Sequence, residues 1–193
     1  MPGDIDRILD RIAEILCQDK AILLDGVSWV RRTRVGFDTL EMTAPVATEG
    51  VLRDGLQARI TCRSDLPDFD VHAQLQVYVP ALSGYAHVQR VEWRPNGPHT
   101  NAANAPAKLR FKTFHDRWYE FSINRRLGVI GLRQTGVMIA QALPRKIGTF
   151  NELLAFPLLS RGAKHASRGL SDPPFKIPAE ASPPFASGSR IFA

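Results

Sequence analysis

The stretch Phe69-Asp70-Val71-His72-Ala73-Gln74-Leu75-Gln76-Val77-Tyr78-Val79 alternates between apolar or small residues at odd positions and polar ones at even positions. A period of two is that of a β-strand whose two faces meet different surroundings. Residues 57–63 repeat the pattern, with Ala58, Ile60 and Cys62 on the inner face. These two segments predict neighbouring strands of a sheet with one buried face and one wet face.

Further strand patterns surround this centre. Residues 85–94 change phase, which predicts a bulge near Gln89-Arg90. Residues 108–114 and 117–123 alternate and predict a hairpin about His115-Asp116, and residues 21–24 and 27–31 predict another about Asp25-Gly26. Residues 39–44 alternate as well. We therefore expect six or seven strands with short connections, and hence a mostly antiparallel sheet.

Helices are predicted at both ends of the domain. Residues 4–19 carry isoleucine and leucine at helical spacing, and Asp4 is suited to cap the helix. Thr149-Phe150-Asn151-Glu152 has the spacing of a capping box ahead of a short C-terminal helix. The fold class we expect is α+β, with the N-terminal amphipathic helix packed on one face of the sheet.

The 193 residues, 44% of them hydrophobic, predict one globular domain over residues 1–156. Residues 157–193 contain six prolines, six serines and five basic residues against two acids. That composition predicts a mostly disordered basic tail.

The charge balance favours acidic partners. The net charge is +6 and the pI about 9.7, which favours nucleic acid or an acidic protein partner. Cys17 and Cys62 form no disulfide framework, and the acidic start of the chain does not resemble a signal peptide. The longest uncharged stretch, residues 71–89, contains Pro80 and Gly84. We expect a cytoplasmic protein without membrane spans.

No familiar enzyme motif is present. Residues 131–136 have the glycine spacing of a phosphate-binding loop, but Val137 and Met138 stand where a lysine and a hydroxyl residue are needed. The spacing of His99, His115 and Asp116 matches no metal-ligand pattern. We predict neither a cofactor nor a metal ion.

The densest chemistry lies around a long loop, residues 95–106, and the turn that follows. If His99 and His115 converge, they can exchange protons with a phosphodiester, with Arg117 opposing the developing charge and Tyr119 beside it. The alternative is a polar loop with turn-forming asparagines and a surface histidine.

A second candidate site is the wet face of the sheet. Five cations fall on its predicted strands, namely Arg59, Arg63, Lys108, Arg110 and Lys112. Adjacent strands would join them into a positive surface for a phosphate backbone, with Trp118 or Tyr78 available for stacking. The alternative is an ordinary solvated strand face, on which lysine and arginine prevent edge pairing.

Three blocks, residues 87–93, 98–101 and 114–121, resemble a pattern in small uncharacterised bacterial domains, some of them in mobile-element or toxin–antitoxin-like loci. The resemblance spans about residues 50–156, implies a compact bacterial domain and brings no assigned catalytic residue. The leading hypothesis is a binding protein whose basic sheet face engages nucleic acid or an acidic protein. The alternatives are a ribonuclease-like toxin or phosphodiesterase that uses His99 and His115, and a protein that forms homodimers.

Overall fold

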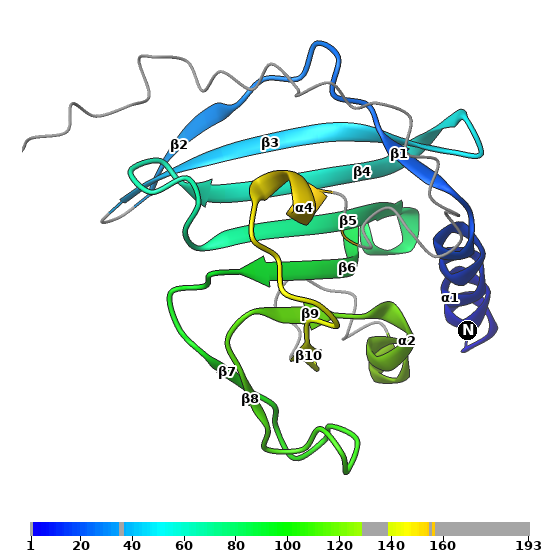
Figure 1. The fold of residues 1–193 in the computed structure, drawn as a ribbon. Helices are drawn as coiled ribbons and strands as arrows, with labels where there is room; N and C mark the ends of the chain where they lie inside the picture. Colours follow the sequence, from blue (N-terminus) through cyan, green and yellow to red (C-terminus); the bar gives the residue numbers. More distant parts are fainter. Residues whose placement is uncertain (1, 35–36, 129–138, 155, 157–193) are drawn as a thin grey trace, which may run out of the picture.

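A computed structural model describes residues 2–34, 37–128, 139–154 and 156 of the chain. The predicted tail, residues 157–193, and the rejected glycine-spaced segment, residues 131–136, lie outside the described residues. Within them, the α+β fold class is confirmed: an N-terminal helix, a large antiparallel sheet and a short C-terminal helix follow one another (Figure 1).

The chain begins with helix α1 (Pro2–Cys17), and strands then follow with few helical interruptions. The strands are β1 (Lys20–Ile22), β2 (Val30–Arg34), β3 (Phe37–Thr48), β4 (Val51–Arg63), β5 (Val71–Val79), β6 (Gly84–Trp93), β7 (His99–Thr100), β8 (Thr113–Phe114), β9 (Arg117–Tyr119) and β10 (Gln141–Ala142). Between or after them lie the short helices η1 (Pro80–Leu82), α2 (Phe121–Asn124), η2 (Arg125–Leu127) and α4 (Phe150–Leu154).

Among the described residues, eight strands form one sheet in the order β1-β3-β4-β5-β6-β9-β10, with β2 also pairing with β3. Every pairing is antiparallel. The register of β5 against β6 shifts between Leu75 and Gln76, where Leu75 faces Gln89 and Gln76 faces His87. This shift confirms the predicted bulge in residues 85–94.

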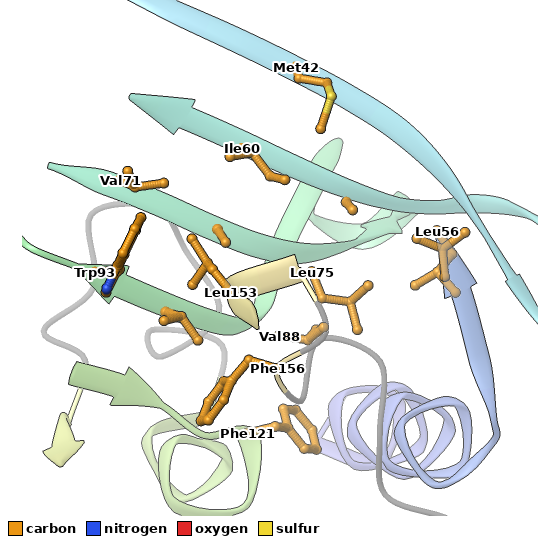
Figure 2. Close-up of a cluster of buried hydrophobic side chains, with 14 of the residues drawn as sticks. Met42, Leu56, Ile60, Val71, Leu75, Val88, Trp93, Phe121, Leu153 and Phe156 are labelled. Carbon is orange, nitrogen blue, oxygen red and sulfur yellow. The ribbon is translucent and has the colours of Figure 1, made fainter. Parts of the chain in front are cut away.

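The apolar face of the sheet carries the core. Leu9 and Ile12 of α1 and Leu153 of α4 are buried with the inward residues of β3 to β6. Figure 2 shows Leu153 and Phe156 lying over the sheet side chains, with Trp93 at one end of the group. The indole Nε1 of Trp93 donates a hydrogen bond to the Ile147 carbonyl, 3.0 Å away. The helices are thus held on one face of the sheet, and the other face is left to polar residues.

The helix cap at the C-terminal end is close to the predicted one. The backbone N–H of Glu152 donates to Thr149 Oγ1 at 3.2 Å, as a capping box requires. The Glu152 carboxylate accepts from the N–H of Gly148 rather than of Thr149, at 2.6 Å. Thr149 is therefore the N-cap, as predicted, and only the reciprocal bond of the Glu152 carboxylate is shifted by one residue.

Two predicted hairpins are wrong. The strands β1 and β2 do not pair with each other, because both pair with β3 along the same edge. Residues 108–112 form turns, and only Thr113–Phe114 of that segment is a strand, β8. It pairs with β7, whereas β9 pairs with β6 in the main sheet and leads into helix α2.

Candidate functional site

The five predicted binding cations do not share one surface. Arg59 lies on the polar face of the sheet and donates to Glu41 Oε2 at 2.7 Å. Arg63, at the end of β4, donates to Asp65 through Nε at 2.9 Å. The expected alignment of all five on the sheet is wrong, because the other three belong to the turns between β7 and β8. The sheet cations have acid partners, so this face is locally neutralised.

The connection between β7 and β8, residues 101–112, is here called the β7–β8 loop. Figure 1 shows this hairpin extending away from the main sheet at the bottom of the view. Lys108, Arg110 and Lys112 are all exposed, and none of them forms an ion pair with an acid within the described part of the chain. No acidic residue occurs between Pro95 and His115. The loop therefore presents three cations that pair with no acid of the described residues.

A buried asparagine orders the loop. Asn101 is 1% exposed, and its side chain both donates to the Ala140 carbonyl and accepts from the Ala140 N–H, at 2.8 Å each. Its Nδ2 also donates to the Leu109 carbonyl at 3.0 Å. The backbone of Asn101 exchanges hydrogen bonds with Lys112 and Phe111. The loop is therefore fixed to the segment before β10 and does not depend on its own short turns alone.

Phe111 stands out within this loop. Its side chain is 66% exposed, and its backbone has a φ of +56°. The left-handed region is unfavourable for a residue with a bulky side chain, and glycine or asparagine suits it better. Arg110 and Lys112 flank it directly. A large apolar ring is thus exposed between two cations, at a position whose backbone conformation is unfavourable for phenylalanine.

The predicted stacking residues differ in their exposure. Trp118 turns to the core side of the sheet, where its ring lies 5.9 Å from that of Phe156, edge to face. Tyr78 is 47% exposed and pairs with the ring of Tyr85, 5.5 Å away. Trp118 is therefore not placed to stack on an external ligand as we expected, and the exposed ring of the loop is Phe111.

The two histidines of the predicted acid–base pair lie in different settings. His99 begins β7, and its ring lies edge to face against Tyr119, with the centroids 5.7 Å apart. In the β7–β8 ladder His99 faces Phe114, and His115 follows as an exposed residue. Because His115 lies in the bend after β8, outside the ladder, the strand pairing does not place the two imidazoles opposite one another.

Arg117 and Tyr119, the other two predicted catalytic residues, belong to a buried ion cluster around Glu92. Glu92 is 2% exposed and forms ion pairs with Arg90 and Arg117. His72 Nδ1 lies 3.4 Å from Glu92 Oε1. These residues come from β5, β6 and β9, and the registers place His72, Glu92 and Arg117 in one row across the polar face. We call this group the Glu92 cluster.

Two members of the Glu92 cluster, Glu92 and Tyr119, have pKa values far from neutral pH. Burial alone would raise the pKa of Glu92. The hydrogen bond with His72 and the neighbouring guanidinium charges outweigh burial and lower that pKa to about 2. Burial, reinforced by the charge of Glu92, raises the pKa of Tyr119 to about 12. Neither group exchanges protons readily near pH 7.

All three nitrogens of the Arg117 guanidinium are engaged within the protein. Its Nε donates to Tyr119 Oη at 3.1 Å, and one terminal nitrogen donates to the Gly97 carbonyl at 2.6 Å and to the Phe114 carbonyl at 3.4 Å. The other terminal nitrogen pairs with Glu92. The predicted role of Arg117, opposing charge on a phosphodiester, is therefore not supported: this guanidinium instead ties the root of the β7–β8 hairpin to the sheet.

A second polar row lies beside the Glu92 cluster. Gln57 donates to Gln76, and Gln76 donates to Gln74 Oε1 at 2.8 Å and to His87 Nε2 at 3.1 Å. His87 is 4% exposed, and burial with two nearby arginines lowers its pKa to about 4. The imidazole is therefore neutral near pH 7, and this row stabilises the sheet by hydrogen bonds.

Sequence reasoning missed Glu92, Asn101 and Phe111. The alternation of residues 108–114 predicts an inward Phe111, and the predicted loop of residues 95–106 gives no sign that Asn101 is buried. A signal for the loop was present, because Pro106 and the asparagines of residues 96–104 are turn-forming. Arg90 is only two residues from Glu92, but the other charged partners, His72 and Arg117, lie 20 and 25 residues away on other strands. No local signal therefore marks Glu92 as buried.

Comparison with models of protein families, with curated proteins and with solved structures found no match for this chain. The resemblance of residues 50–156 to small bacterial domains therefore stays a prediction. Among the described residues, no group of three or more histidine, cysteine or acidic side chains could hold a metal ion. In the same residues, no helix is both long and apolar enough to cross a membrane.

Proposed function

We propose that this protein binds nucleic acid, and that the β7–β8 loop is the contact surface. One observation carries the proposal: Lys108, Arg110 and Lys112 project from an ordered loop that contains no acid. Lysine and arginine that meet a phosphate backbone release condensed counterions, which supplies most of the affinity of non-specific binding. The proposal keeps the predicted partner and moves its site from the sheet face to the loop.

The contrast with the sheet supports this assignment. Arg59, Arg63 and Arg117 each have a carboxylate within ion-pair distance, so a phosphate would have to compete with an existing partner. The loop cations have no such competitor among the described residues. Their backbone is already ordered by Asn101, so binding does not have to order it.

The predicted cytoplasmic location is part of the proposal. Cys17 and Cys62 are both free thiols, which suits a reducing compartment. Nucleic acid is accessible there.

Fluorescence anisotropy with labelled 20-nucleotide oligonucleotides, at 50 and 200 mM salt, tests the proposal. Three phosphate contacts on a single strand predict a log–log salt slope of about −2, or about a 20-fold weakening over that range. Replacing all three loop cations (Lys108→Gln, Arg110→Gln, Lys112→Gln) should abolish most of the binding and flatten the slope.

A matched variant controls for net charge. Arg7→Gln, Arg126→Gln and Lys146→Gln remove three exposed cations from other elements. This variant should bind nearly as the wild type does. Equal losses in both triple variants, or no binding at 50 mM salt, would show that the loop is not the site. An acidic peptide that binds better than the oligonucleotides would identify a protein partner instead.

A further inference from the structure

The conformation and exposure of Phe111 bear on the class of ligand that the β7–β8 loop binds. Its φ of +56° costs free energy for any residue that has a Cβ, and a ring exposed by 66% recovers little of it through burial. Asparagine or glycine would fit this backbone better. A residue that is unfavourable for the fold and exposed to solvent is best explained by contact with a ligand.

The position of the ring is defined by backbone hydrogen bonds on both sides. The N–H of Phe111 donates to the Asn101 carbonyl at 3.1 Å, and the next residue, Lys112, donates to the Leu109 carbonyl at 3.2 Å. The carbonyl of Lys112 in turn accepts from Asn101 N at 3.0 Å. The ring is therefore presented from a fixed backbone, which lowers the entropy lost when a flat partner stacks on it.

The chemistry around the ring fits a nucleotide whose base is unpaired. Arg110 and Lys112 precede and follow Phe111, so a base on the ring would have its flanking phosphates beside two cations. Aromatic side chains next to cations are the usual means of binding single strands, because every base offers a flat face. In a duplex the base faces are covered by their neighbours, and only the phosphates remain accessible to this loop.

A membrane surface fits the loop less well. Phe111 lies one residue from Lys112 and two from the start of β8, at the root of the loop rather than at residues 102–107. Those residues are alanine, asparagine and proline. Interfacial binding needs a broad apolar face as well as cations, and the loop offers a single large ring.

We infer that the ligand of the β7–β8 loop is single-stranded nucleic acid, and that Phe111 is the residue on which a base stacks. This inference rests on the proposed function and adds the class of ligand and the residue that selects it. The loop cations attract any phosphate backbone, whereas Phe111 separates single strands from duplexes.

The test compares four probes of equal length with the wild type and two variants. The probes are a 20-nucleotide single-stranded DNA, the RNA of the same sequence, a duplex, and a single strand with abasic positions at its centre. Phe111→Asn removes the ring but suits the left-handed backbone, so its thermal midpoint should be no lower than that of the wild type. Phe111→Trp keeps a stacking surface.

Phe111→Asn should weaken binding of the intact single strands about 10-fold or more and leave duplex binding unchanged. The wild type on the abasic strand should bind as weakly as Phe111→Asn does on the intact one, and Phe111→Trp should retain single-strand affinity. The RNA and DNA arms show which of the two sugars the loop accepts.

Each failure has its own meaning. If Phe111→Asn binds all probes as the wild type does, Phe111 does not stack and the inference is wrong, while the proposed function stands. If no probe binds the wild type, the proposed function itself is wrong. Anionic vesicles that bind the wild type but not Phe111→Asn would overturn the inference in favour of a membrane surface.

Discussion

Replacing Glu92 by glutamine tests whether the Glu92 cluster stabilises the fold. The substitution keeps the shape of the side chain and removes its charge, which leaves Arg117, whose side chain is 11% exposed, without a counter-charge. Breaking a buried ion pair by removing one partner costs about 3–5 kcal/mol. A pKa of about 2, against an ordinary value of 4.5, independently corresponds to about 3 kcal/mol. We expect Glu92→Gln to lower the free energy of unfolding by about 3 kcal/mol or more at pH 7.

The stability difference between the wild type and Glu92→Gln should depend on pH. A carboxyl group whose pKa is lower in the folded state stabilises the fold fully above its unfolded pKa, and this contribution is lost as the pH falls toward the folded one. The difference between wild type and Glu92→Gln should therefore shrink from pH 5 to pH 2. Urea denaturation across this range measures it, with Asp65→Asn, which removes an exposed ion pair, as the control expected to match the wild type. A loss at pH 7 below about 1 kcal/mol, typical of surface pairs, would refute the reasoning.

Three further substitutions probe other parts of the polar framework. Burial and nearby arginines lower the pKa of His87 to about 4 in the folded protein. The unfolded chain therefore binds a proton at this residue more readily, and the free energy of unfolding of the wild type should fall as the pH decreases from about 6.5 to 4. His87→Gln should flatten that decline in urea denaturation. Asn101→Ala removes both hydrogen bonds to the Ala140 backbone, and it should lower the free energy of unfolding by about 2–4 kcal/mol. Hydrogen exchange at the Ala140 amide should become faster. Unchanged exchange would contradict the role given to Asn101. Gly55→Ala places a Cβ 3.0 Å from the Cβ of Tyr78 at a φ of +75°, and a lower thermal midpoint should reveal a loss of about 1–2 kcal/mol.

The buried face of β5 and of the second half of β4 could be predicted from the sequence. Their alternation assigns Ile60, Ala73 and Leu75 to the core, and all three are buried. Such strands satisfy local propensity and tertiary burial together, so a pattern of period two is sufficient evidence. The bulge in β6 was predictable for the same reason, because a change of phase is written in the sequence itself.

The loop was mispredicted because its alternation is coincidental. Residues 108–112 alternate between cationic and apolar side chains, as a half-buried strand does. In the structure the Pro106 carbonyl instead accepts hydrogen bonds from the N–H groups of Leu109 and Arg110, 2.8 and 2.9 Å away, and so closes a turn. The contacts of Asn101 with Ala140 then fix this turn across 39 residues of chain. Local patterns carry no information about such a distant partner.

The Glu92 cluster escaped prediction for a related reason. In the sequence, Arg90 and Glu92 alternate with apolar residues, and charged residues at such positions usually face solvent. Their burial depends on the pairing of β6 with β9, which brings Arg117 opposite Glu92. In the sequence, the β7–β8 hairpin lies between β6 and β9. The predicted hairpin paired residues 117–123 with residues 108–114, and so left β9 unavailable to β6.

The distribution of acids explains where the positive charge of the protein is available. The chain has 25 cations against 19 acids, and carboxylates of the described residues pair with sheet arginines such as Arg59, Arg90 and Arg117. Those arginines hold strands together and contribute little outward field. An excess that is unevenly paired is felt most where no acid is near, and the acid-free β7–β8 loop is one such place in the described chain. The same Arg117 that is neutralised by Glu92 also binds the carbonyls of Gly97 and Phe114 at the root of that loop. The buried charges therefore serve to position the exposed ones.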